Sequence, residues 1–128
     1  MSSTPPEPGR PAPDSPPDPR TPGIEARHVA HVIDEVMRGR GDSPALRHKV
    51  AGEWRDVTWR ELDERVRALA SGLVEAGIGE GDRVAILAPN QPDWTVADLA
   101  ILRVRGVSVP IHATSSAAQV GFILRDSG

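Results

Sequence analysis

The stretches Arg83-Val84-Ala85-Ile86-Leu87 and Val107-Ser108-Val109-Pro110-Ile111 decide the fold of this chain. Each is a short, mostly apolar run without regular polar alternation, and Asp82 and Pro89 bound the first one. Such runs are typical of strands buried on both faces of a parallel sheet. A helix expected from about residue 92 to residue 105 connects them, which predicts a β-α-β unit with a right-handed crossover. The predicted fold class is therefore α/β, with a parallel sheet flanked by helices.

A long helix is predicted directly before the first of these strands. Thr58 and Glu61 have the spacing of a capping box, in which each side chain accepts a hydrogen bond from the backbone N–H of the other residue. Gly77 supplies a left-handed residue to end the helix. We expect one apolar stripe and one charged face. The stripe contains Leu62, Val66, Leu69, Leu73 and Val74, and the charged face contains Arg60, Asp63, Glu64 and Arg67.

Two more helices and a hairpin complete the predicted elements. Helical spacing from Ile24 to Met37 predicts a first helix with Val29, Val32, Ile33 and Val36 on one face, ended by Gly39 and Gly41. Residues 45–49 and 53–57 are predicted to form a hairpin around Gly52 at the edge of a sheet. Ser116 and Gln119 can form a second capping box, for a last helix that ends near Asp126.

The first 23 residues have a different composition from the rest. Residues 1–23 hold nine of the thirteen prolines and almost no large apolar residues. Such a segment cannot bury enough surface to offset the entropy of ordering, so we expect a disordered tail with polyproline II character. Its proline spacing also fits a PxxP ligand, although biased composition alone produces such matches. The folded domain is expected to span residues 24–128.

Composition excludes several classes of function. The net charge is -3, the pI is near 5.8 and Lys49 is the only lysine, so the electrostatic footprint of a nucleic-acid partner is missing. The chain has no cysteine, which excludes disulfides, a thiolate nucleophile and the usual structural zinc sites. No apolar run approaches the roughly 20 residues of a transmembrane span, and no secretory signal pattern is present. These features predict a cytoplasmic protein.

Several residues are site candidates, and each also has a structural interpretation. Residues 77–82 carry three alternating glycines that could expose N–H groups to phosphate, but Glu80 and Asp82 would repel it and the helix precedes the loop. A turn into the strand is the preferred interpretation. His28 and His31 are spaced to share a metal but have no third ligand nearby, so we expect a solvated pair. His48 receives no functional role.

The segment after the second strand holds the remaining candidates. His112 follows the carboxyl end of a predicted parallel strand, where α/β sheets place ligands. The hydroxyls of Thr114, Ser115 and Ser116 can contact a ligand, although capping of the next helix is favoured. Trp54, Trp59 and Trp94 are expected to pack in the core. Arg105 is expected at a helix end, where the macrodipole favours a cation and a salt bridge to a later acidic residue is possible.

Five blocks of sequence together resemble one enzyme superfamily. They are Thr58-Trp59-Arg60-Glu61-Leu62, Gly79 to Leu87, Asn90-Gln91-Pro92-Asp93-Trp94, Leu102 to Ile111 and Gln119 to Gly128. In this order and spacing they are similar to the N-terminal region of AMP-forming acyl-CoA synthetases, members of the adenylate-forming superfamily. The resemblance covers somewhat more than half of the chain. Val104-Arg105 in the fourth block resembles the long-chain fatty acid–CoA ligases, whereas His112 departs from them, since they usually have Tyr there.

The resemblance implies the activity of a complete enzyme rather than of this region. Such an enzyme activates a carboxylic acid with ATP to an acyl-adenylate and transfers the acyl group to CoA, so ATP, Mg²⁺, CoA and a fatty acid are implied. Family members are several hundred residues long, and their phosphate loop, cation and acidic residue lie beyond Gly128. We therefore expect a truncated, inactive first part of the AMP-binding domain, with no catalytic, cofactor-binding or metal-binding residue of its own.

Two other functions stay open. One is the adenylation domain of a peptide synthetase, which shares the first and fourth of these blocks. The other is a non-catalytic α/β interaction module. The apolar strands 83–87 and 107–111 need packing partners on both faces of the sheet. The chain supplies only three or four helices, so we also expect an exposed apolar face and self-association.

Overall fold

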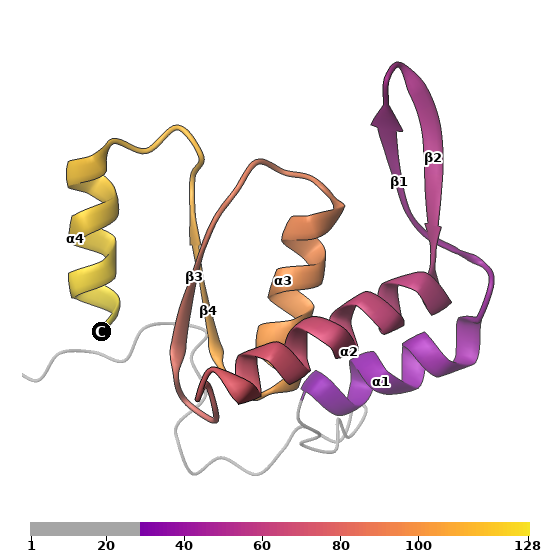
Figure 1. The fold of residues 1–128 in the computed structure, drawn as a ribbon, viewed down its shortest axis with the longest axis horizontal. Helices are drawn as coiled ribbons and strands as arrows, with labels where there is room; N and C mark the ends of the chain where they lie inside the picture. Colours follow the sequence, from indigo (N-terminus) through magenta and orange to yellow (C-terminus); the bar gives the residue numbers. More distant parts are fainter. Residues whose placement is uncertain (1–28) are drawn as a thin grey trace, which may run out of the picture.

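The computed structural model describes residues 29–128, which form four helices and four strands (Figure 1). Their order is α1 Val29–Arg40, β1 Pro44–Val50, β2 Glu53–Thr58, α2 Trp59–Glu75, β3 Arg83–Leu87, α3 Pro92–Arg103, β4 Val107–Ile111 and α4 Ala117–Ser127. The expected α/β class is confirmed. The expected tail, the boundary between residues 23 and 24, and the expected helix start at Ile24 lie outside the described residues.

The β3-α3-β4 unit is the centre of the fold. β3 and β4 pair in parallel, in register from Arg83 with Val107 to Leu87 with Ile111. Figure 1 shows α3 on one side of this sheet and α4 on the other. Two backbone hydrogen bonds join the turns that lead into the strands, from Gly81 N–H to the Arg105 carbonyl at 3.0 Å and from Val107 N–H to the Asp82 carbonyl at 2.7 Å. The starts of the two strands are therefore held next to each other.

The expectation that both strands are buried on both faces was wrong. Alternate residues of a strand point to opposite faces. On β3, Ile86 is buried and Val84 half-buried, whereas Arg83, Ala85 and Leu87 are all exposed. The physical reason is incomplete cover, since α4 packs on β4 and buries none of its own residues fully. One face of the sheet is thus closed by α3, and the other stays partly open.

Both helices that lead into these strands end in the same way. At the end of α2, Gly77 N–H donates to the Val74 carbonyl and Ile78 N–H donates to the Leu73 carbonyl. This pair of bonds is a Schellman motif, with Gly77 in the left-handed region at φ +88°. The predicted helix end at Gly77 is confirmed.

The end of α3 repeats this pattern with a different residue. Arg105 N–H donates to the Leu102 carbonyl and Gly106 N–H to the Ile101 carbonyl. Arg105, not a glycine, takes the left-handed position, at φ +61°. The expectation for Arg105 needs correction, because the residue lies after the helix, and its guanidinium is 3.8 Å from the carboxylate of Glu80, which precedes it in the chain.

The main core lies between α1, α2, α3 and the hairpin. Its buried members are Met37, Val57, Leu62, Val66, Ala70, Val96 and Ala100. The predicted capping box of α2 is confirmed by hydrogen bonds from Glu61 N–H to Thr58 Oγ1 and from Thr58 N–H to Glu61 Oε2. The predicted stripe is correct for Leu62 and Val66 and wrong for Leu69 and Val74, which are exposed, because the helix turns Ala70 to the core instead.

Asp63, expected on the charged face of α2, lies between helices. Its Oδ2 accepts a hydrogen bond from Arg67 Nε at 2.7 Å, and its Oδ1 is 3.8 Å from Arg103 Nη1. Arg103 also pairs with Asp34 of α1. One arginine of α3 therefore links α1 and α2, and Figure 1 shows these two helices side by side.

The predicted hairpin is present, and it is separate from the parallel sheet. β1 and β2 form their own antiparallel two-stranded sheet and contact α2. Ala51 and Gly52 both have positive φ, as a two-residue hairpin turn requires. Trp54 is 63% exposed, with Lys49 Nζ 5.0 Å from its ring centroid, which corrects its expected core role. Trp59, in contrast, packs against the core as predicted.

Candidate functional site at the carboxyl end of the sheet

The loops after β3 and β4 lie side by side, because parallel strands end at the same edge of a sheet. Residues 88–91 follow β3 and lead into α3, and residues 112–116 follow β4 and lead into α4. Ligands of open α/β sheets bind outside the carboxyl ends of the strands. This end of the molecule is therefore the place to look for a site.

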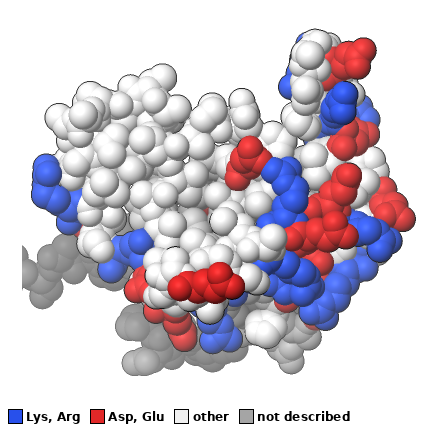
Figure 2. Space-filling view, viewed as in Figure 1, with Lys and Arg blue, Asp and Glu red and all other residues white. Residues whose placement is uncertain are grey.

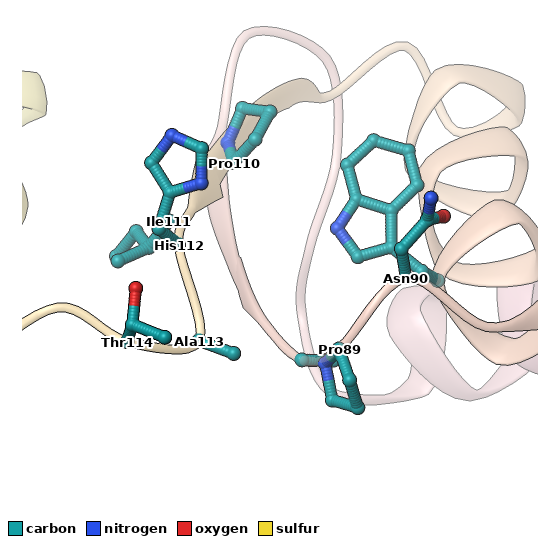
Figure 3. A pocket seen from close by; sticks show the side chains of 9 residues that line it. Pro89, Asn90, Pro110, Ile111, His112, Ala113 and Thr114 are labelled. Atoms are coloured by element: carbon teal, nitrogen blue, oxygen red, sulfur yellow. The ribbon is translucent and has the colours of Figure 1, made fainter.

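A pocket of about 350 Å³ opens between these two loops (Figure 3). Pro89 and Asn90 form one wall and the segment from Pro110 to Thr114 forms the other, as Figure 3 shows. Trp94, from the first turn of α3, and Ala88 complete the lining. Trp94 was expected to pack in the core, and the structure places it at this pocket, half-buried.

The lining defines what the pocket can do. Among the described residues that line it, none is Lys, Arg, Asp or Glu. It cannot neutralise a triphosphate, and it offers no carboxylate to Mg²⁺, so these residues do not fit either group. Prolines, Trp94 and Ile111 supply apolar surface, and Asn90, His112 and Thr114 supply hydrogen-bonding groups. The pocket suits an uncharged part of a ligand.

His112 is one of the sequence candidates that the structure brings to the site. It is exposed, and it lines both this pocket and a second one of about 490 Å³ against α4. Its backbone carbonyl accepts a hydrogen bond from Ser115 N–H at 2.9 Å, which shapes the turn between the two pockets. Because it belongs to both, a change of its side chain alters both linings at once.

The three hydroxyl candidates have different surroundings. Thr114 lines the first pocket and Ser115 lines the second. Ser116 is the N-cap of α4, where its Oγ accepts from Gln119 N–H at 3.2 Å and Gln119 Oε1 accepts from Ser116 N–H at 2.8 Å. The predicted second capping box is confirmed, and it occupies the Ser116 hydroxyl.

The glycine loop at residues 77–82 is a structural turn. Gly77 N–H donates to the Val74 carbonyl, Gly79 N–H to Asp82 Oδ2 at 2.8 Å, and Gly81 N–H to the Arg105 carbonyl. All three glycine N–H groups are thus used within the chain and are not available to phosphate. The preferred interpretation of this loop is confirmed.

Of the candidate histidine pair, the structure describes one member. His31 is exposed on α1, and His28 lies outside the described residues. Within residues 29–128, no three His, Cys, Asp or Glu side chains are grouped so as to hold a metal ion. His48 lies half-buried in the hairpin, away from the pocket.

Asn90 is the pocket residue that sequence reasoning missed. It was noted only as part of a motif. The signal was available, because Asn90 follows β3 as Thr114 follows β4, and the carboxyl ends of parallel strands meet. Applied to both strands together, that rule predicts that the loop after β3 lies next to the loop after β4.

Comparison with known proteins identifies a family and several relatives of this chain. The model of the family described as AMP-binding enzyme matches residues 33–128. The long-chain-fatty-acid–CoA ligase FadD15 of Mycobacterium bovis is 42% identical over 103 residues, 80% of this chain and 17% of the ligase. Surfactin synthase subunit 1 of Bacillus subtilis is 32% identical over 109 residues, 85% of this chain and 3% of the synthase.

Solved structures give the same result. The N-terminal subdomain of Klebsiella oxytoca NpsA, in complex with 3-hydroxyanthranilyl-AMSN, matches with a TM-score of 0.73 and 30% identity, over 80% of this chain and 25% of that chain.

The fold and these matches define the class: an adenylate-forming enzyme, of which this chain corresponds to the N-terminal region. The chain belongs to the AMP-binding enzyme family. The family resemblance stated from the sequence is thus confirmed. The chain spans 17% of the length of the curated ligase that it matches. Among residues 29–128 no helix is long and apolar enough to cross a bilayer, and the cytoplasmic location stays a prediction.

Proposed function

We propose that this chain is the N-terminal segment of a fatty acid–CoA ligase. The complete enzyme would join a carboxylic acid to AMP from ATP, release pyrophosphate, and pass the acyl group to the thiol of CoA. The observation that carries the proposal is the 42% identity to the fatty-acid ligase FadD15, against 32% to the peptide synthetase subunit.

The segment itself would act as scaffold. The pocket at the carboxyl end of the sheet has no charged lining residue among those described, so ATP and Mg²⁺ would be held by other parts of the enzyme. The contribution of this segment is the placement of the loops at residues 88–91 and 112–116, which present uncharged groups to that end of the sheet. Fatty acid and CoA are the partners of the whole enzyme, and self-association is proposed for the segment itself.

A second candidate is the adenylation domain of a peptide synthetase. It is favoured by the match to surfactin synthase subunit 1 and by the structural match to NpsA. The two candidates differ in the acid that is activated and in the thiol that receives it.

The test uses the longest polypeptide that contains this sequence. We expect pyrophosphate exchange that depends on fatty acids, and an acyl-CoA product identified by mass spectrometry. Exchange that depends on amino acids, without an acyl-CoA product, would favour the second candidate. If neither kind of acid supports exchange, the result would favour the non-catalytic interaction module.

The 128-residue chain alone is a separate test. We expect no pyrophosphate exchange above the rate of a mock purification. Among the described residues that line the pocket, none is a cation that could stabilise the phosphoryl group during transfer. Exchange by the isolated chain would contradict the scaffold role.

His112→Ala tests the pocket in the active polypeptide. Loss of a general base costs about 10²–10⁴-fold in rate, so a kcat within about tenfold of the parent would assign His112 to the lining and not to proton transfer. His31→Ala, at an exposed histidine away from the pocket, is the matched control.

A further inference from the structure

Two helices of this chain carry the same pair of opposite charges. On α1, Asp34 precedes Arg38 by four residues, and on α2, Asp63 precedes Arg67 by four residues. Residues four apart lie on one face of a helix, so each aspartate has an arginine of its own helix beside it. Figure 2 shows Lys, Arg, Asp and Glu gathered over α1, α2 and the hairpin, whereas the surface over α4, β3 and β4 is largely uncharged. The charged side of the molecule thus contains two matching ion pairs.

Arg103, in the last turn of α3, lies between the two aspartates. Its Nη1 donates a hydrogen bond to Asp34 Oδ1 and is 3.8 Å from Asp63 Oδ1. The side chains of Arg103 and Asp63 are 20% exposed and that of Asp34 is 22% exposed. In such partly desolvated surroundings a hydrogen bond is electrostatically stronger than in water. The partner that Arg103 takes therefore has energetic consequences.

The present arrangement leaves one oxygen without a partner. Asp63 Oδ1 is buried and accepts no hydrogen bond among the described residues. A buried acceptor that is left unsatisfied is unfavourable, and more so when it carries charge. If Arg103 moved from Asp34 to Asp63, this oxygen would be satisfied. Asp34 would keep Arg38, whose Nη2 is 3.6 Å from Asp34 Oδ2. Arg103 thus has two alternative carboxylate partners, one on α1 and one on α2.

α1 depends on the first of these partners, because few of its side chains are buried. Within α1, all of which the structure describes, Met37 is the only fully buried residue. Ile33 is half-buried against the core, whereas Val29 and Val32 are 46% and 45% exposed. Elements with few buried apolar contacts open at lower free energy than the whole domain. The bond from Arg103 is therefore a large part of what holds α1 in place.

The chain directly after α1 is fixed to the start of α2. Trp59 N–H donates to the Ser43 carbonyl at 3.1 Å, and Arg60 N–H donates to the Gly41 carbonyl at 2.9 Å. These bonds do not involve α1 itself. When α1 opens, residues 41–43 therefore stay in place and serve as the hinge.

We propose that Arg103 exchanges between Asp34 and Asp63, and that this exchange controls the opening of α1. Paired with Asp34, Arg103 holds α1 against α2 and α3. Paired with Asp63, it releases α1, which turns about residues 41–43. Removing one partner of a buried ion pair is strongly destabilising when the other charge is left alone. Asp63 prevents this loss, because it gives Arg103 a carboxylate partner in the open state as well. The proposal does not depend on the ligase activity.

Two asparagine variants distinguish this exchange from a fixed ion-pair network. Asp34→Asn weakens the closed pairing, so amide protons of α1 should exchange about tenfold faster, the effect of losing a bond between charged groups. Asp63→Asn removes the partner of the open state, so the same protons should exchange at least about threefold more slowly. A fixed network predicts faster exchange in both variants. Amide protons of α2 and α3 report global unfolding and serve as the internal reference.

Asp56→Asn is the matched control for these variants. Asp56 accepts a hydrogen bond from Arg47 Nε at 2.6 Å within the hairpin, so the change removes an aspartate–arginine pair outside the network. It should leave the exchange of α1 relative to α2 unchanged. Far-ultraviolet circular dichroism identifies any variant that has lost its fold.

Single cysteines give a second readout of the same opening. The chain has no cysteine, so Met37→Cys on α1 and Val66→Cys on α2 each carry one thiol, at positions that are 2% and 0% exposed. A thiol reagent should label Met37→Cys at least about tenfold faster than Val66→Cys, because α1 opens without global unfolding. This comparison leaves Asp63 unchanged, so it remains decisive if Asp63→Asn does not fold.

Three outcomes would overturn the proposal. Faster or unchanged exchange of α1 in Asp63→Asn would show that Asp63 does not stabilise an open state. Equal labelling of the two thiols would show that α1 opens only when the whole chain unfolds. An effect of Asp56→Asn on α1 as large as that of Asp34→Asn would assign the change to a general loss of charge pairing.

Discussion

Arg105 occupies a backbone conformation that suits glycine. Its φ of +61° is the left-handed position that closes α3. A residue with a Cβ in this conformation costs roughly 1–2 kcal/mol relative to glycine. Glycine also gives the unfolded chain more conformational entropy, which offsets part of that gain in stability. We expect Arg105→Gly to raise the free energy of unfolding by roughly 0.5–1 kcal/mol in chemical denaturation.

A control separates the backbone from the guanidinium. Arg105→Ala removes the pairing with Glu80 but keeps the Cβ, so it should give no such gain. If Ala stabilises as much as Gly, the gain comes from the side chain and the backbone explanation is wrong.

Gly106 is required for a different reason, the lack of space. A Cβ built on it would lie 3.1 Å from the Asp82 carbonyl oxygen and 3.1 Å from Ile101 Cγ2. Since the carbonyl belongs to the turn into β3, it cannot move freely. We expect Gly106→Ala to lower the free energy of unfolding by about 1–3 kcal/mol.

The matched control is Gly72→Ala, at a helical glycine with nothing within 4 Å of the built Cβ. It should stabilise the chain by about 0.8–1 kcal/mol through helix propensity. Equal effects of the two alanines would contradict the steric explanation.

At the scale of elements, the two capping boxes have unequal consequences. Thr58 caps α2, which buries Leu62, Val66 and Ala70, so Thr58→Ala should cost about 1 kcal/mol in global unfolding. Ser116 caps α4, which buries no residue fully, so Ser116→Ala should loosen α4 and hardly move the global midpoint. Denaturation curves followed by circular dichroism measure both, and equal midpoints for Thr58→Ala and the parent would exclude Thr58 as the stabilising cap.

Sequence reasoning predicted these elements well and their packing less well. The capping boxes, the Gly77 end and the parallel pairing follow from local spacing and from the absence of alternation in β3 and β4. The exposed Val74, the buried Oδ1 of Asp63 and the separate hairpin depend on which helix packs where. Periodicity gives an apolar face but not the angle at which a neighbour covers it. For the site, His112 was found from its place after a strand end and Thr114 from its hydroxyl, and Asn90 was missed because its loop was read alone.

At the scale of the whole molecule, stability should be uneven. The main core joins α1, α2, α3 and β2, and α4 has no member in it. Elements with few buried apolar contacts open with lower free energy than the global unfolding. We expect amide protons of α4 to exchange well before those of α2 and α3, measured by hydrogen exchange at low protein concentration. Equal protection of α4 and α2 in the monomer would contradict this prediction.

The joined turns at the start of β3 and β4 have a consequence for how length can vary along this chain. Residues 77–82 and 104–107 are held by mutual backbone hydrogen bonds and by the tight approach at Gly106, so an inserted residue there would displace both strands. The loops at residues 88–91 and 112–116 have no such bonds to each other among the hydrogen bonds of the described residues. Insertions and deletions should therefore be tolerated at the pocket end and rejected at the opposite end, so that the shape of the pocket can diverge while the sheet that carries it does not.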